Sequence, residues 1–137
     1  MENLEINNGH EMFDVPVVNF NADTGECVIE GESYLEKTAE FYDHLLAWLN
    51  QYMAEVKGDI KFSFRLTYFN TSSSKRILHI MLRLKEYVDS GSVVKTSWHY
   101  NPKDIEMEEA IEDFMSIAKL DIRLVPDSKM KFSPFNK

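Results

Sequence analysis

The chain has 137 residues, of which 44% are hydrophobic and 12% aromatic, and its formal net charge at pH 7 is −8. This length and apolar content indicate one globular domain with a buried core and exclude an intrinsically disordered chain. The acidic balance excludes nucleic acid as an expected partner, because a negative surface repels phosphate backbones. With no apolar run of ~20 residues and no signal-peptide pattern at the start, we expect a cytoplasmic protein without membrane insertion.

The residues that most often hold metals or perform catalysis show no productive pattern. A single cysteine, Cys27, excludes an internal disulfide and a cysteine-only metal cluster. The histidines lack the i, i+4 spacing of a helical zinc site: they are His10, His44, His79 and His99. Neither a Gly-rich phosphate loop nor a Gly-x-Ser-x-Gly elbow is present. We therefore expect no metal, no cofactor and no catalytic residue.

The N-terminal part of the chain reads as a flexible segment followed by a hairpin. Residues 1–13 are polar and are predicted to be flexible. Apolar and β-branched residues at 15–20 and 26–30 predict two strands, and the turn residues between them include a glycine. The domain is therefore expected to begin at residue 14.

A helix and a strand follow the hairpin. Apolar side chains recur on one helical face, at Phe41, Leu45, Trp48, Leu49, Tyr52 and Val56. This spacing predicts a helix that Ser33 or Thr38 caps and that ends at residues 57–59. Residues 62–68 alternate at period two, which is typical of a strand with one buried face. A second helix is expected from the hydroxyl residues after this strand to about Ser90.

The C-terminal part adds a strand, a helix and a short strand. Residues 92–100 are rich in Val, Thr, Trp and Tyr, which favours a strand. Pro102 is predicted to open a third helix, and residues 122–125 to form a last strand. The order predicts an α/β domain over residues 14–126, with strands that helices join running parallel in a mixed sheet covered by helices. Residues 127–137 are expected to form a polar tail without regular structure.

Four hydroxyl residues, 71–74, stand where the central strand gives way to the second helix. Free backbone N–H groups and the positive end of the helix dipole favour a negative charge at such a place. A phosphate on Thr71 would find donors there, and Ser72 and Ser73 are the alternative acceptors. Capping is the simpler interpretation, since Ser and Thr are ordinary N-cap residues.

Other candidate residues lie at the same predicted edge of the sheet. Parallel strands that end at Tyr68 and Tyr100 place Trp98, His99 and Tyr100 near the hydroxyl residues, and Tyr34 lies in a loop that borders this edge. Two alternatives to a switch remain open. One is a small enzyme that uses a cluster of Thr71, His99 and Tyr100; the other is a structural scaffold subunit.

Several segments in a fixed order resemble the SiaC family of bacterial regulatory phosphoproteins, which are associated with biofilm control. They are residues 31–36, 41–49, 68–75, 98–100 and 112–114, and the block Asn70-Thr71-Ser72-Ser73-Ser74-Lys75 is the most specific of them. The resemblance covers about residues 15–125. It implies a fold similar to the STAS domain of anti-anti-sigma factors.

The same resemblance implies a function in signal transduction by partner switching. A Ser/Thr protein kinase would phosphorylate Thr71, a phosphatase would remove the phosphate, and the unmodified form would engage an effector such as a diguanylate cyclase. This assignment makes the protein a non-enzymatic part of cyclic di-GMP signalling. The partner-binding residues it implies, together with the strand-end residues above, are Tyr34, Asn70, Ser72, Ser73, Lys75, Trp98, His99 and Tyr100.

Overall fold

The computed structural model describes residues 1–7, 15–34 and 36–132. In these residues a single mixed sheet carries six strands in the spatial order β1-β2-β3-β4-β5-β6. The strands are β1 (Leu4–Ile6), β2 (Val17–Phe20), β3 (Glu26–Ser33), β4 (Ile60–Phe69), β5 (Val94–Tyr100) and β6 (Ile122–Pro126). The helices are α1 (Thr38–Glu55), α2 (Thr71–Asp89) and α3 (Ile105–Ala118).

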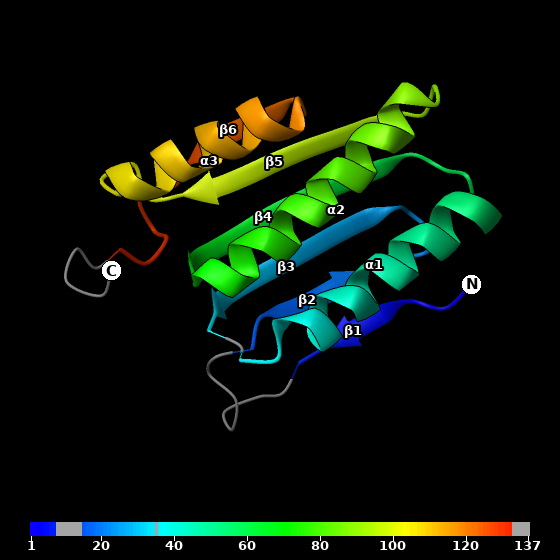
Figure 1. Cartoon of the computed structure of the whole chain (residues 1–137), viewed down its shortest axis with the longest axis horizontal. Helices are drawn as coiled ribbons and strands as arrows, with labels where there is room; N and C mark the ends of the chain where they lie inside the picture. Colours follow the sequence, from blue (N-terminus) through cyan, green and yellow to red (C-terminus); the bar gives the residue numbers. More distant parts are fainter. Residues whose placement is uncertain (8–14, 35, 133–137) are drawn as a thin grey trace.

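In the described sheet, β2 runs antiparallel to the other five strands. The pairs β1–β2 and β2–β3 are antiparallel, whereas β3, β4, β5 and β6 run parallel to one another. One helix connects each parallel pair, and each connection steps to the next strand in the same direction. Crossovers of one hand that step in one direction place their helices on one face, and α1, α2 and α3 do lie together on one face of the sheet (Figure 1). The predicted α/β class is therefore confirmed, with helices covering one face only.

The core fills the space between the sheet and the helices. On β4, fully buried side chains alternate with partly exposed ones; the buried ones are Ile60, Phe62, Phe64 and Leu66. Of the apolar face predicted for α1, Leu45, Trp48, Leu49 and Tyr52 are buried, whereas Phe41 is partly buried and Val56, just after the helix, is 40% exposed. Because side chains on a strand alternate between its two faces, Lys61, Ser63 and Arg65 lie on the face without helices. We call this the uncovered face.

Several predicted element boundaries differ from the structure, and two of the differences have a clear structural cause. Within the segment expected to be flexible, Leu4–Ile6 form β1 and pair with β2; residues 8–14 lie outside the described residues. The third helix begins at Ile105 and not at Pro102, because the Asp104 side chain is the N-cap and accepts from the Met107 N–H at 3.1 Å. Asn101 accepts from the Lys103 N–H instead, which places Pro102 in a turn before the helix.

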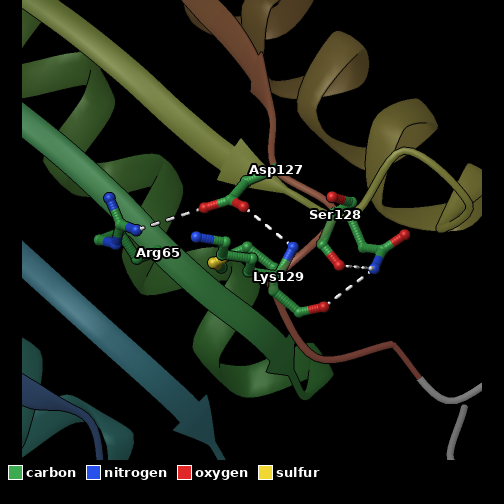
Figure 2. A network of polar contacts seen from close by, with 6 residues as sticks. Arg65, Asp127, Ser128 and Lys129 are labelled. Atoms are coloured by element: carbon green, nitrogen blue, oxygen red, sulfur yellow. Dashed lines mark hydrogen bonds and ion pairs between the residues drawn. The ribbon is translucent and has the colours of Figure 1, made fainter.

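The segment after β6 has no helix or strand in its described part, but it is hydrogen-bonded to the sheet. The Asp127 N–H donates to the Tyr100 carbonyl oxygen at 2.7 Å, and the Asp127 carboxylate pairs with Arg65 at 3.7 Å. The Asn101 amide donates to the carbonyl oxygen of Met130 at 2.9 Å. Figure 2 shows the contact between Arg65 and Asp127. Together these contacts hold the chain against the end of the sheet as far as Met130.

Candidate partner-binding site

The start of α2 is capped by Asn70 and not by a hydroxyl residue. The backbone of Asn70 is extended, with φ −83° and ψ 175°, and its side-chain oxygen accepts from the Ser73 N–H at 2.9 Å. The Asn70 carbonyl oxygen accepts from the Ser74 N–H, also at 2.9 Å. Since Asn70 performs the capping, the hydroxyl groups that follow are not needed for it.

The four hydroxyl residues of α2 have different environments. Thr71 and Ser72 are exposed in the first turn of the helix. The Ser74 hydroxyl bends back and donates to the Thr71 carbonyl oxygen at 2.8 Å. Ser73 is fully buried, so the folded protein offers its hydroxyl neither to a kinase nor to a partner surface. Of the three predicted acceptors, Thr71 and Ser72 are therefore the accessible ones.

A buried hydroxyl network lies directly under this first turn. The Ser33 hydroxyl, at the end of β3, lies 2.7 Å from the Ser73 hydroxyl and 2.8 Å from the Tyr42 hydroxyl on α1. The Ser33 carbonyl oxygen also accepts from the Ser73 hydroxyl at 3.2 Å and from the Asn70 N–H at 3.0 Å. The sequence analysis considered Ser33 only as a helix cap and did not identify Tyr42. A signal for the network was available, because Ser33 is a polar residue at a strand position that faces the core.

Burial of this network changes the pKa of Tyr42. Burial raises the pKa of Tyr42 to about 12, while its hydrogen bonds to Ser33 and Ser73 act in the opposite direction. The network therefore stays neutral at physiological pH. It links β3, α1 and α2 by directional bonds, which fixes the position of the exposed Thr71 relative to the sheet.

Aromatic side chains surround the end of β4. The ring of Tyr34 stacks on Tyr68, with centroids 4.5 Å apart and an interplanar angle of 23°. Phe69 contacts two rings of the core, Trp98 at 5.8 Å and Phe114 at 5.6 Å between centroids. The structure thus brings the predicted residue Tyr34 to the strand end that precedes Thr71.

A groove that the sequence did not indicate opens between β4 and α3. Its volume is about 200 Å³, and its lining consists of Thr67, Tyr68, Phe69, Glu106, Met107 and Ala110. Ile105, the residue before Glu106, is 64% exposed. An aromatic and apolar surface of this kind next to Thr71 is typical of a protein-binding site.

The three predicted residues at the end of β5 are divided between the two faces of the sheet. Trp98 is fully buried, its indole N–H donates to the Leu66 carbonyl oxygen at 3.3 Å, and Tyr100 is buried as well. These two side chains pack in the core, so their burial does not agree with the direct partner contact expected of them. His99 points to the uncovered face, where burial and the charge of Arg65 lower its pKa.

The division of these residues also separates the members of the predicted enzyme cluster. Thr71 lies on the helix-covered side of the sheet, whereas the imidazole of His99 lies on the uncovered face, so the sheet stands between them. The groove beside Thr71 is lined by no histidine. A hydroxyl nucleophile needs a base within hydrogen-bond reach, and among the described residues no hydrogen bond joins Thr71 to a histidine.

In the part of the chain that the structure describes, no group of three or more His, Cys, Asp or Glu side chains converges as metal ligands would. None of the helices in residues 1–7, 15–34 and 36–132 is long and apolar enough to cross a membrane. Cys27 is buried, and burial raises the pKa of its thiol.

Known proteins show the same fold and sequence pattern. The chain matches the family model of SiaC family regulatory phosphoproteins over residues 9–127. It is 28% identical over 99 residues to an uncharacterized protein of Pseudomonas aeruginosa (strain UCBPP-PA14), covering 72% of this chain and 79% of that protein.

Solved structures agree with this match. The crystal structure of apo-SiaC from Pseudomonas aeruginosa has a TM-score of 0.82 and 25% sequence identity, and covers 91% of this chain and 99% of that one. The structure of the diguanylate cyclase SiaD in complex with its activator SiaC, from the same organism, has a TM-score of 0.83 and 24% identity, covering 90% and 99%. The chain belongs to the SiaC family of regulatory phosphoproteins.

Proposed function

We propose that this protein is a phosphorylation-controlled binding switch in bacterial signalling. Its unmodified form engages an effector protein, and phosphorylation of Thr71 releases that effector. The observation that carries the proposal is the exposed Thr71 in the first turn of α2, a turn whose cap is supplied by Asn70. A protein kinase and a phosphatase would set the fraction of modified molecules. The proposed location is the cytoplasm, where such enzymes act on it.

A diguanylate cyclase is the proposed class of effector. The support is the structural relative that is described as the activator of the diguanylate cyclase SiaD and is in complex with it. On this chain, the effector would contact the Tyr34–Tyr68 stack and the groove between β4 and α3. The stack includes Tyr68 and the groove includes Phe69, which precede Thr71 by three and two residues, so an effector bound there would cover the strand end that leads to Thr71.

The first turn of α2 is suited to hold a phosphate. The Asn70 cap satisfies the amides of Ser73 and Ser74, while the amides of Thr71 and Ser72 precede them and face the helix terminus. A phosphate on Thr71 adds about −1.5 to −2 charges, and Lys75, exposed one turn further along α2, is within reach to pair with it.

Release then follows from the cost of burying that charge. An effector that covers Thr71 without matching donors would have to desolvate a dianion, which costs several kcal/mol and is enough to abolish binding of ordinary affinity. The protein itself needs no catalytic group for this function. Its role as a non-enzyme agrees with the separation of Thr71 from His99 across the sheet.

The test compares two substitutions at Thr71 with a matched surface control. Affinity for a diguanylate cyclase from the same organism is measured by calorimetry for Thr71→Glu, Thr71→Ala and Ser116→Glu, the last being exposed on α3. We expect Thr71→Glu to weaken binding at least tenfold, with Thr71→Ala and Ser116→Glu close to the unsubstituted protein. Unchanged binding by Thr71→Glu would contradict the proposed release.

Mass spectrometry identifies the modified hydroxyl. Protein isolated from its own host should carry an addition of ~80 Da on the tryptic peptide 66–75, localised to Thr71 by fragmentation, and Thr71→Ala should lose it. If the addition persists in Thr71→Ala and disappears in Ser72→Ala, the neighbouring exposed hydroxyl is the acceptor and the assignment to Thr71 is wrong.

A further inference from the structure

A basic cavity lies on the uncovered face of the sheet, near the start of the strands β4, β5 and β6. Its volume is about 550 Å³, a size typical of small-ligand sites. Among its lining residues are Lys61, Ser63, Lys95, Ser97, Asp121 and Arg123. Three cationic side chains thus gather around one hollow in a chain whose net charge is −8. Such a local concentration of positive charge attracts a small anion from solution.

The strand register explains why the cavity forms there. Lys61 and Lys95 lie side by side on β4 and β5, and the next row on this face holds Ser63, Ser97 and Arg123. Because the two serines are small, a hollow remains between the lysine side chains and the arginine. The Ser97 hydroxyl donates to the Ser63 hydroxyl at 3.3 Å. Within the described residues, no hydrogen bond uses the Ser63 hydroxyl proton, so it is available to a ligand.

The cations of the cavity are not neutralised by ion pairs. Within residues 1–7, 15–34 and 36–132, no ion pair involves Lys61, Lys95 or Arg123. Glu26 lies opposite Lys61, and Asp121 lies next to Lys95, but neither is close enough to pair. Like charges opposite each other on neighbouring strands repel, so an anion between the two lysines would relieve an unfavourable contact.

The C-terminal segment leaves this cavity open to solvent. Asp127 pairs with Arg65, and residues 129–131 line a separate pocket that includes Arg65, toward the other end of the strands. None of the described residues after Pro126 lines the basic cavity. Its three cationic side chains are exposed, so a ligand from solution reaches all of them.

We propose that this cavity binds a small soluble anion with two linked phosphate groups, such as inorganic pyrophosphate or a nucleoside diphosphate. The lysine row and Arg123 lie two residues apart along the strands, ~6.6 Å, so one phosphate contacts the lysines while the second reaches the arginine. The planar guanidinium of Arg123 donates in pairs to phosphate oxygens, and the lysine ammonium groups act as compact charges. The Ser63 hydroxyl donates from below.

The phosphate groups carry the recognition in this site. Its described lining has no aromatic ring on which a nucleobase could stack. Pyrophosphate and a nucleoside diphosphate are therefore bound through the same contacts. Thr71 begins α2 on the helix-covered side of the sheet, so this site does not depend on the proposed switch.

Titration with sodium pyrophosphate at low salt tests the proposal, with calorimetry for affinity and proton–nitrogen correlation NMR for location. We expect sub-millimolar binding, with amide shifts concentrated at Ser63, Ser97 and Arg123. Because salt screens exposed charges, affinity should fall at least about tenfold between ~20 mM and ~500 mM NaCl. Orthophosphate, with fewer charges and one phosphate group, should bind at least about fivefold more weakly. Equal affinity for orthophosphate would contradict a site for two linked phosphates.

ADP distinguishes the two sources of the ligand. An affinity equal to or below that of pyrophosphate is expected if the phosphates alone are bound. Tighter binding of ADP would still place the phosphates in the cavity if the same amides shift, and it would identify a nucleoside diphosphate as the ligand. ADP shifts at other amides would contradict the assignment of nucleotides to this site.

Substitutions separate a defined site from diffuse attraction. Lys95→Gln and Arg123→Gln each remove one cation and should weaken pyrophosphate binding at least about fivefold. Lys103→Gln removes an exposed cation outside the cavity and should bind normally. Asp121→Asn removes a carboxylate from the lining and should bind more tightly. Ser97→Val keeps all three cations but fills the hollow between them, so it too should weaken binding at least about fivefold.

Circular dichroism verifies that each variant is folded before its affinity is interpreted. Equal effects of Lys95→Gln and Lys103→Gln, or normal binding by Ser97→Val, would show diffuse attraction of an anion and overturn the site. A pyrophosphate dissociation constant weaker than about 10 mM at low salt overturns the proposal altogether.

Discussion

The hydroxyl oxygens of Ser33 and Ser73 lie 2.7 Å apart in the protein interior, and this contact joins the end of β3 to the first turn of α2. Tyr42 extends it to α1 through its own bond to the Ser33 hydroxyl. All three side chains are buried, so their polar atoms depend on one another for hydrogen bonds. Packing and hydrogen bonding therefore hold this network in one arrangement, and the network fixes the position of the exposed Thr71 in the first turn of α2.

Replacing the central member of this network should destabilise the protein. Ser33→Ala removes a partner from both Ser73 and Tyr42, and a buried donor or acceptor left without its partner costs about 1–3 kcal/mol. We expect the free energy of unfolding to fall by about that amount, as measured by urea titration. Ser72→Ala is the control, because Ser72 is exposed beside the network and its substitution should change stability by less than ~0.5 kcal/mol. Equal effects of the two would show that the network adds nothing.

The stability of the protein should fall at alkaline pH, in part through Tyr42. Its pKa is raised to about 12 in the folded state by burial, against ~10 in the unfolded chain, so the folded state holds this proton more tightly. The stabilisation is complete below pH ~10 and is lost as the pH rises toward 12, with a slope of at most ~1.4 kcal/mol per pH unit. Urea titrations between pH 9 and 11.5 measure it.

Tyr42→Phe is the variant that isolates this effect. It is expected to be less stable at pH 8, since the bond to Ser33 is lost, but to lose stability less steeply above pH 10. The buried Cys27 thiol, whose pKa is also raised, acts in the same direction in both proteins and leaves a common slope. Parallel curves for the two proteins would contradict the assignment to Tyr42.

A glycine in the turn between β2 and β3 is predicted to be irreplaceable. Gly25 has φ +76°, and a Cβ atom there would lie 2.0 Å from the Asp59 carbonyl oxygen and 2.6 Å from the Tyr52 hydroxyl. Gly25→Ala must therefore displace backbone, and we expect a loss of at least ~3 kcal/mol in unfolding free energy. Gly91 also has a positive φ, +101°, but nothing lies within 4 Å of its Cβ position, so Gly91→Ala should lose only ~1 kcal/mol.

The comparison of these two glycines by urea titration separates steric contact from backbone strain. Both substitutions carry the strain of a side chain at positive φ, and only Gly25→Ala adds the clash with Asp59 and Tyr52. A similar loss for both would show that the turn moves aside without difficulty.

The elements that the sequence predicts well are those with long local patterns. The period of two on β4 and the apolar face of α2 each extend over many residues, so local reasoning finds them. The short edge strand Leu4–Ile6 has no such length. It is held by pairing with β2 and by the Trp48 indole, which donates to the Glu2 carbonyl oxygen at 2.9 Å, a contact between distant parts of the chain.

The candidate site also depends on contacts between distant parts of the chain, which local sequence patterns do not predict. Alternation along β5 indicates that His99 faces away from Trp98 and Tyr100, but it does not say which face α2 covers. That depends on the spatial order of all six strands, since crossovers in one direction collect the helices on one face. The groove between β4 and α3 was missed for the same reason, because Phe69 and Met107 meet only in the folded chain.

Effector binding should depend on the exposed apolar residue beside this groove. Ile105 is 64% exposed at the start of α3, next to Glu106 in the groove wall, and Ile117 is 61% exposed at the far end of the same helix. Under the proposed function, Ile105→Glu places an unpaired charge in the interface and should weaken cyclase binding at least tenfold. Ile117→Glu makes the same chemical change and should bind normally. Calorimetry on both variants decides: equal affinities would place the effector away from the groove, whereas a loss confined to Ile105→Glu would tie binding to the surface beside Thr71.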